Sequence, residues 1–169
     1  MLQIKDRHFL KKKALNDLKT RIKNHFNINE DLLFSKSSRL EMLKTESEMT
    51  LYFIDDEATL IELDNVIYPT VNALLSKKIM HPEVAIDKGA IKFIINGADV
   101  MVPGIVETSE SIEKGDIICI VDIEFKKTLA IGKAMMSAKE IKEKNKGKAV
   151  QNLHHVGDKI WNTIKKMKD

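Results

Sequence analysis

Residues 117–121, which read IICIV, restrict the possible folds of this 169-residue chain more than any other segment. Successive side chains of a strand point to opposite faces, so a strand with five apolar residues in a row must be buried on both faces. Such a strand fits inside a small closed or sandwiched sheet. Strand-like runs flank it at residues 100–106 and 128–136, with turns between them. The second half of the chain therefore predicts a compact module rich in short strands.

The first half of the chain has a different pattern. Residues 11–26 place apolar side chains at helical spacing with Lys and Arg on the opposite face, which predicts an amphipathic helix. Pro69, directly after Tyr68, fits the first turn of a second short helix. Between these helices, three β-like runs predict an antiparallel meander, at residues 40–46, 49–55 and 58–64. Together these elements predict an α+β module.

A domain boundary is predicted in residues 76–84, SKKIMHPEV. Helices seldom continue through a residue that precedes proline, so Pro82 ends the first pattern. We expect residues 1–76 to form the N-terminal α+β module and residues 77–169 to form the C-terminal module.

The second module begins with a short helix over residues 88–96. Asp87 can cap its start, and Gly97 can take the left-handed conformation that closes a helix. The later part predicts three more elements: a helical turn with a capping box at Ser137 and Glu140, a last strand at residues 148–156, and a lysine-bearing helix from Asp158 onward.

Two strings of this module resemble a PUA domain, the small pseudo-barrel found in RNA-modifying and translation proteins. They are IDKGAIKFIINGADVMVPGIV and LAIGKAMMSAKEIKEKNKGKAVQNLHHVGDKIW. With YPTVNALL upstream, the whole chain resembles the family of the malignant T-cell amplified sequence protein and its archaeal relatives, most strongly from Tyr68 to Trp161. The resemblance implies an N-terminal helix and meander module followed by a C-terminal PUA pseudo-barrel.

The short helix carries the candidate RNA-binding side chains. Lys88 and Lys92 are four residues apart and share one face, while Gly89 lets a phosphate or ribose approach the backbone. The alternative is that Asp87 only caps the helix and that both lysines are solvated. The resemblance implies an RNA groove between this helix and the last strand, and it points to Lys88, Gly89, Ala90, Lys92, Gly97, Met101, Pro103, Gly104, Lys133 and Lys148.

Several residues of this region also have structural interpretations. Pro103 and Gly104 have the sequence of a type II turn, in which glycine supplies the positive φ angle. Phe93 is expected to be a core residue rather than a base-stacking one, and Met101 also fits a place in the core. Ile91, Ile94 and Ile95 are expected to turn toward the barrel.

Charge is distributed unevenly along the chain, although the net charge is only +3. Residues 1–25 hold eight Lys and Arg against two acids, residues 26–125 hold eight against nineteen, and residues 126–169 hold twelve against four. Basic ends favour a polyanion partner, because the local potential attracts phosphate. Solvated lysine-rich helices would give the same pattern.

The sequence contains no pattern that predicts catalysis, a cofactor or a metal site. Cys119 lies inside the apolar run and is expected to be buried, and the five histidines have no zinc-finger spacing. Neither a Gly-rich phosphate loop nor a nucleophile paired with a base is present. No apolar run approaches the roughly 18 residues that cross a bilayer, so we expect a cytoplasmic protein without a membrane partner.

The function that the resemblance implies is RNA binding in translation, on the small ribosomal subunit and tRNA during initiation or recycling. It also implies an initiation-factor-like protein as a partner. Two alternatives remain open: an RNA-targeting accessory subunit of a tRNA or rRNA modification enzyme, and a protein-interaction adaptor.

Overall fold

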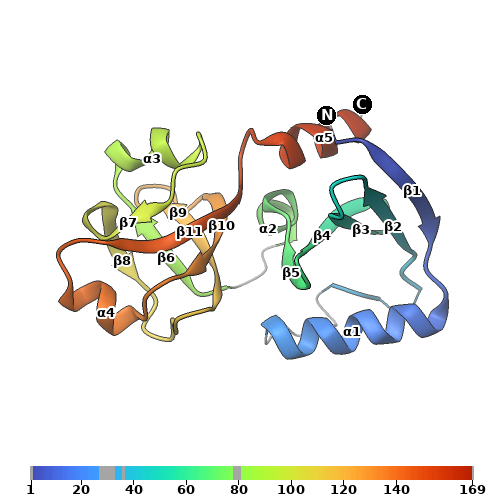
Figure 1. The fold of residues 1–169 in the computed structure, drawn as a ribbon, viewed down its shortest axis with the longest axis horizontal. Coiled ribbons are helices and arrows are strands. Elements are labelled where there is room, and N and C mark those ends of the chain that lie inside the picture. The colour runs from blue at the N-terminus through green and yellow to red at the C-terminus, as the bar shows by residue number, and fades with distance from the viewer. Residues whose placement is uncertain (1, 27–32, 36, 78–80, 169) are drawn as a thin grey trace. The chain divides into compact units, whose positions relative to one another are not determined.

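The computed structural model describes residues 2–26, 33–35, 37–77 and 81–168. The contacts within the chain divide it into two compact units, Met1–Met80 and His81–Asp169. Figure 1 traces the elements of both units from the N-terminus to the C-terminus.

The described residues of the first unit form a five-stranded antiparallel sheet and two helices, α1 (Lys12–Phe26) and α2 (Val71–Lys77). Its strands follow one another in the sheet in chain order: β1 (Ile4–Phe9), β2 (Leu40–Thr45), β3 (Thr50–Ile54), β4 (Glu57–Leu63) and β5 (Val66–Pro69). The predicted helix and the three-stranded meander are confirmed. A tight turn joins β4 to β5, with φ of 50° at Asp64 and 63° at Asn65, which is the conformation that two-residue hairpins require.

Two strands of this sheet were not predicted. All six residues of β1 are exposed, so no apolar alternation marks it in the sequence. The prediction that Pro69 starts a helix was wrong: Pro69 ends the edge strand β5 and pairs with Leu60. An edge strand tolerates proline, because an N–H that faces away from the sheet has no partner strand and its absence in proline costs no hydrogen bond. The helix begins two residues later, where the Thr70 hydroxyl accepts a hydrogen bond from the N–H of Ala73 at 3.0 Å.

The second unit is a six-stranded sheet that curls into a nearly closed barrel. Its strands are β6 (Glu83–Ile86), β7 (Val100–Met101), β8 (Ile105–Thr108), β9 (Ile117–Asp122), β10 (Thr128–Ala134) and β11 (Lys148–His155), and their order in the sheet is β7-β11-β10-β9-β6-β8. Among the described strands of this sheet, β6 and β9 alone pair in parallel. The first and last strands of this order, β7 and β8, are joined by the three-residue 3₁₀ turn η2 (Val102–Gly104), so the sheet must bend back on itself.

The predicted apolar strand lies at the centre of this sheet. Residues 118–121 of β9 are all buried, including Cys119, as expected of a strand covered on both faces. Burial raises the pKa of the Cys119 thiol to about 12. The packed core around the strand consists of aliphatic side chains alone, among them Ile86, Ile118 and Ile120. The α+β pseudo-barrel is thus confirmed.

Three helices complete the second unit: α3 (Lys88–Ile94), α4 (Ala138–Glu143) and α5 (Lys159–Lys168). The predicted capping box of α4 is present, since Ser137 and Glu140 each accept a hydrogen bond from the other's backbone N–H. No helix in the described ranges is both long and apolar enough to cross a membrane.

Candidate nucleic-acid interface

A groove of about 670 Å³ lies between α3 and the β7–η2 segment. Six of the ten predicted RNA-binding residues line it: Gly89, Ala90, Lys92, Met101, Pro103 and Gly104. The other lining residues are Asp87, Phe93, Ile94, Ala98, Asp99 and Val100. The tertiary structure thus brings together two stretches that are about ten residues apart in the chain.

The start of α3 is attached to the η2 turn by backbone contacts. Asp87 caps the helix as predicted, because its Oδ1 accepts a hydrogen bond from the N–H of Ala90 at 2.8 Å. The N–H of Asp87 donates to the carbonyl oxygen of Gly104 at 3.0 Å. A Cβ at residue 104 would lie 3.3 Å from the Cβ of Ala90. The start of α3 and the η2 turn, which form two walls of the groove, are therefore held close together.

The expected type II turn at Pro103 and Gly104 was wrong. The segment is a 3₁₀ turn, and Gly104 is absent from the residues with positive φ. Glycine is used here for close approach to α3 rather than for a left-handed backbone.

Phe93 was expected in the core, and this expectation was wrong; for Met101, a predicted RNA-binding residue, the alternative place in the core was wrong as well. Phe93 is 57% exposed and Met101 is 49% exposed, and both line the groove. Ile95 is exposed as well, so only Ile91 and Ile94 of the three isoleucines pack against the core. The aliphatic core is complete without these larger side chains, which leaves them as apolar surface inside the groove.

The lysines of α3 are the exposed cations of this site. Lys88 is the first residue of the helix, and the Nζ of Lys92 lies 4.9 Å from the centroid of the Phe93 ring, within cation–π range. Within the described part of the chain, neither lysine has a carboxylate at ion-pair distance. Both charges are therefore available to an anionic ligand.

Lys148 has a different environment. It stands opposite Met101 in the pairing of β7 with β11, and its Nζ lies 2.5 Å from Oδ2 of Asp99. The Lys148 ammonium, together with the N–H of Asn152, holds the pKa of the Asp99 carboxyl below its usual range, although burial opposes this. Asp99 thus neutralises Lys148 at the edge of the groove.

Four of the predicted residues lie outside the groove lining: Lys88 and Lys148, described above, and Lys133 and Gly97. Lys133 lies on β10, opposite Gln151 of β11. Gly97 has a φ of 89° just after α3, and a Cβ at this position would lie 3.3 Å from Nε2 of His155. Gly97 therefore serves the turn that follows α3 and the packing against His155.

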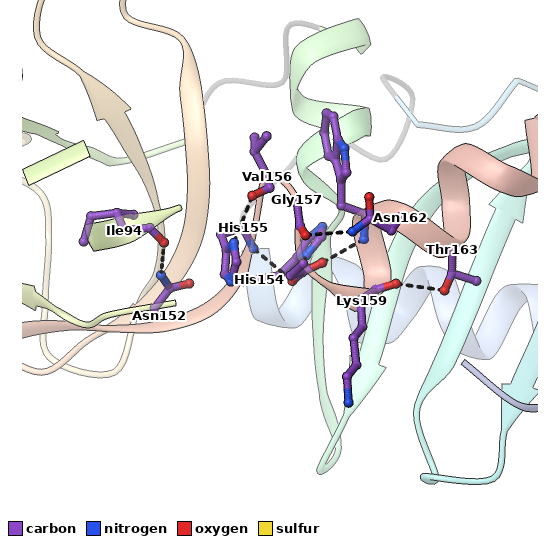
Figure 2. A network of polar contacts seen from close by, with 11 residues as sticks. Ile94, Asn152, His154, His155, Val156, Gly157, Lys159, Asn162 and Thr163 are labelled. Atoms are coloured by element: carbon purple, nitrogen blue, oxygen red, sulfur yellow. Dashed lines mark hydrogen bonds and ion pairs between the residues drawn. The ribbon is translucent and has the colours of Figure 1, made fainter. Parts of the chain in front are cut away.

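Asn152 is a positioning residue that sequence reasoning missed. Its side-chain Nδ2 donates to the carbonyl oxygens of Ile94 and Ala98, both at 3.0 Å, and its backbone N–H donates to Oδ1 of Asp99 at 2.9 Å. Figure 2 shows the contact between Asn152 and Ile94. These bonds attach the end of α3 to β11. The only signal in the sequence was a polar residue inside a strand.

A second polar network follows at the end of β11 (Figure 2). His154 is fully buried, and its Nδ1 lies 2.7 Å from Oδ2 of Asp158. The other oxygen of Asp158 accepts a hydrogen bond from the N–H of Trp161 at 2.7 Å, which caps α5. Burial tends to raise the pKa of Asp158, but these bonds hold it below its ordinary value. Among the described residues, no group of three potential ligands could hold a metal ion.

The fold and the groove define a class of protein: a two-part chain whose C-terminal half is a PUA pseudo-barrel. The family models agree with this class, since the PUA domain matches residues 82–156 and a domain of unknown function (DUF1947) matches residues 6–77. Together the two models account for nearly the whole chain.

Curated relatives extend over both halves of the chain. An uncharacterized protein of Methanocaldococcus jannaschii is 41% identical over 161 residues, which covers 95% of this chain and 98% of the relative. Translation machinery-associated protein 20 of Saccharomyces cerevisiae is 35% identical over 138 residues, covering 78% and 76%. Malignant T-cell-amplified sequence 1-B of Xenopus laevis is 24% identical over 159 residues, covering 90% and 88%. The chain belongs to the family that includes these proteins, as the sequence resemblance predicted.

A solved structure has a similar fold over almost the whole chain. The crystal structure of a hypothetical protein from Pyrococcus horikoshii has a TM-score of 0.81 at 34% identity, and the match covers 94% of this chain and 99% of that one.

Proposed function

We propose that this chain is an RNA-binding protein of the translation machinery and that it binds RNA in the α3 groove. The observation that carries the proposal is the chemistry of this groove. Its surface is mostly apolar and includes the exposed side chains of Phe93 and Met101. Lys92 in the lining and Lys88 at the start of α3 supply charge, and neither has an acidic partner in the described part of the chain.

This combination fits a nucleotide better than it fits either a purely apolar or a purely ionic ligand. A base can lie against Phe93 and Met101, because base–aromatic stacking tolerates any base. The phosphate that follows can then interact with a lysine of α3. The groove is about the size that such a ligand needs, since ligand pockets usually measure roughly 300–1,000 Å³.

The translation part of the proposal rests on the relatives, one of which is named as associated with the translation machinery. We propose the small ribosomal subunit as the assembly and the end of a tRNA acceptor arm as the local ligand. In this role the chain acts by occupying a position on a large RNA assembly rather than by catalysis, and an initiation-factor-like protein is its proposed partner.

The direct test is the double variant Lys88→Ala/Lys92→Ala, with affinity for single-stranded RNA measured across a salt series. Each lost phosphate contact should reduce the slope of log affinity against log salt by about 0.7. Lys139→Ala is a matched control, because Lys139 is an exposed lysine on α4 outside the groove. An unchanged slope in the double variant, with equal affinity, would show that the lysines are only solvated.

The ribosomal part has its own test. In a sucrose gradient of extract from the source cell at low salt, the protein should sediment with the small subunit and leave it as salt rises. Recovery only in the ribosome-free fractions, even after mild crosslinking, would contradict the ribosomal role and leave RNA binding intact.

A further inference from the structure

The exposed ring of Phe125 lies at the tip of the β9–β10 hairpin and has no role in the packing described so far. The second unit has two phenylalanines, Phe93 and Phe125, and both are excluded from a core that is entirely aliphatic. Phe125 is 73% exposed, the largest fraction among the exposed large hydrophobic side chains of the described residues. Folding therefore does not explain why an aromatic ring stands at this position.

The hairpin tip holds the ring in a fixed place. Asp122 is buried, and its two carboxylate oxygens accept hydrogen bonds from the N–H groups of Phe125 at 2.5 Å and Lys127 at 2.9 Å. The N–H of Lys126 donates to the carbonyl oxygen of Asp122 at 3.1 Å, and Lys126 has the left-handed φ of 53°. A turn with this many internal bonds keeps Phe125 exposed without the entropic cost of ordering a loose loop on binding.

Lys127 places a positive charge beside the ring. The Nζ of Lys127 lies 5.9 Å from the centroid of the Phe125 ring, and Lys126 forms an ion pair with Glu107 of β8. The same pairing of a phenylalanine with its neighbouring lysine occurs on α3, where Lys92 lies over Phe93. An aromatic face with an adjacent ammonium is suited to a base followed by a phosphate.

The hairpin tip and the α3 groove lie at the same end of the barrel. Strands β6 and β9 are parallel, with Ile86 beside Asp122 in the pairing, and both strands end at these residues. The N–H of Ile123 donates to the carbonyl oxygen of Ile86 at 3.2 Å. Asp87, the cap of α3, is the next residue after Ile86. Neighbouring strands are only about 4.8 Å apart, so the hairpin leaves the sheet one strand away from the start of the groove.

We infer that Phe125 is a second stacking platform, which binds an unpaired base of the RNA strand whose neighbouring nucleotides occupy the α3 groove. This inference rests on the proposed function and adds a contact that extends the site beyond the groove. It also specifies the ligand: an unpaired base is needed at the hairpin, because a base inside a duplex has no free face to offer the ring.

The test compares Phe125→Ala with Phe125→Trp in the full chain, using a fluorescein-labelled single-stranded oligoribonucleotide and fluorescence anisotropy. Phe125→Ala should weaken binding about fivefold or more, since losing one base–aromatic stack costs at least about 1 kcal/mol. Phe125→Trp should retain the affinity. The salt slope should stay unchanged in both variants, because no phosphate contact is lost. Phe9→Ala is the matched control, since Phe9 of β1 is also exposed, at 58%.

A second measurement reports on the contact itself. The chain has one tryptophan, Trp161, so Phe125→Trp combined with Trp161→Phe places a single reporter at the hairpin. The oligoribonucleotide should quench its fluorescence, and inorganic phosphate should not.

The two proposals fail in different ways. If wild type and Phe125→Ala bind the oligoribonucleotide equally and the tryptophan is not quenched, this inference is wrong and the hairpin is better assigned to a protein partner. If wild type binds no single-stranded RNA at all, both the proposed function and this inference are wrong.

Discussion

Asp99 and Lys148 show how single residues set the charge of the candidate site. Lys148 was predicted as an RNA ligand, but its ammonium lies against a carboxylate in the groove wall. This partner was not predictable from the sequence, because residues 99 and 148 become neighbours only when β7 pairs with β11. The lysines of α3, which are four residues apart on a local element, were predictable from spacing alone.

The variant Asp99→Asn should bind RNA more tightly than wild type, because it releases Lys148 while an amide oxygen can still accept the bond from the N–H of Asn152. The salt slope should become steeper by about 0.7, as expected for one additional phosphate contact. Glu110→Gln removes the same charge at an exposed position outside the groove. Equal gains in the two variants would mean that net charge, and not Lys148, is responsible.

Gly132 supports a second prediction at the residue scale. A Cβ at this position would lie 2.4 Å from Cγ1 of Val150 and 2.6 Å from the backbone oxygen of Gln151. Gly132→Ala should therefore lower the free energy of unfolding by about 1–3 kcal/mol, the usual cost of overpacking. Chemical denaturation followed by circular dichroism measures this, with Gly115→Ala for comparison, where the built Cβ meets no atom within 4 Å but the φ of 99° is strained. A smaller loss at Gly132 than at Gly115 would contradict the role of close packing.

At the scale of elements, capping residues decide where the helices of the second unit begin. The capping roles of Asp87 and of the Ser137–Glu140 pair were predicted from sequence and are confirmed, because capping is local. Helix α5 adds a non-local feature, since the aspartate that caps it also bonds the buried ring of His154 in β11. The end of the strand and the start of the helix thus share one carboxylate.

Asp158 should make stability depend on pH at the acidic end. Its pKa is lower in the folded chain than in the unfolded one, so its contribution is complete above about pH 4 and is lost as pH falls through the folded-state pKa. Asp158→Ala should cost about 1–2 kcal/mol near pH 7, as for a lost cap, and should reduce this loss of stability in acid. Thermal melts of both proteins from pH 2 to 7 measure the effect. A constant difference between them across the whole range would contradict the linkage.

At the scale of the whole molecule, basic residues concentrate toward the ends of the chain, and the last 44 residues hold twelve Lys and Arg against four acids. The candidate groove and the exposed hairpin both belong to the second unit. RNA affinity is therefore expected to reside mainly in that unit.

The fragment from Lys77 onward should fold alone and retain most of the RNA affinity, while residues 1–76 should bind poorly. Circular dichroism melts of the two fragments test folding, and anisotropy with the same oligoribonucleotide tests binding. Similar affinity in the two separate fragments would show that the binding surface is not confined to the PUA domain.

The sequence by itself determined the features that depend on neighbours along the chain: the doubly buried strand β9, the meander, the helix caps and the family. Periodicity, propensity and capping act within a few residues, so the sequence alone is enough to predict these features. The tertiary structure alone decided which of these residues share a surface. It exposed Phe93 and Met101, neutralised Lys148, used Gly104 for close approach, and placed β1 and β5 at the edges of a sheet. Each of these outcomes depends on pairing between distant segments, and no local pattern encodes the partner.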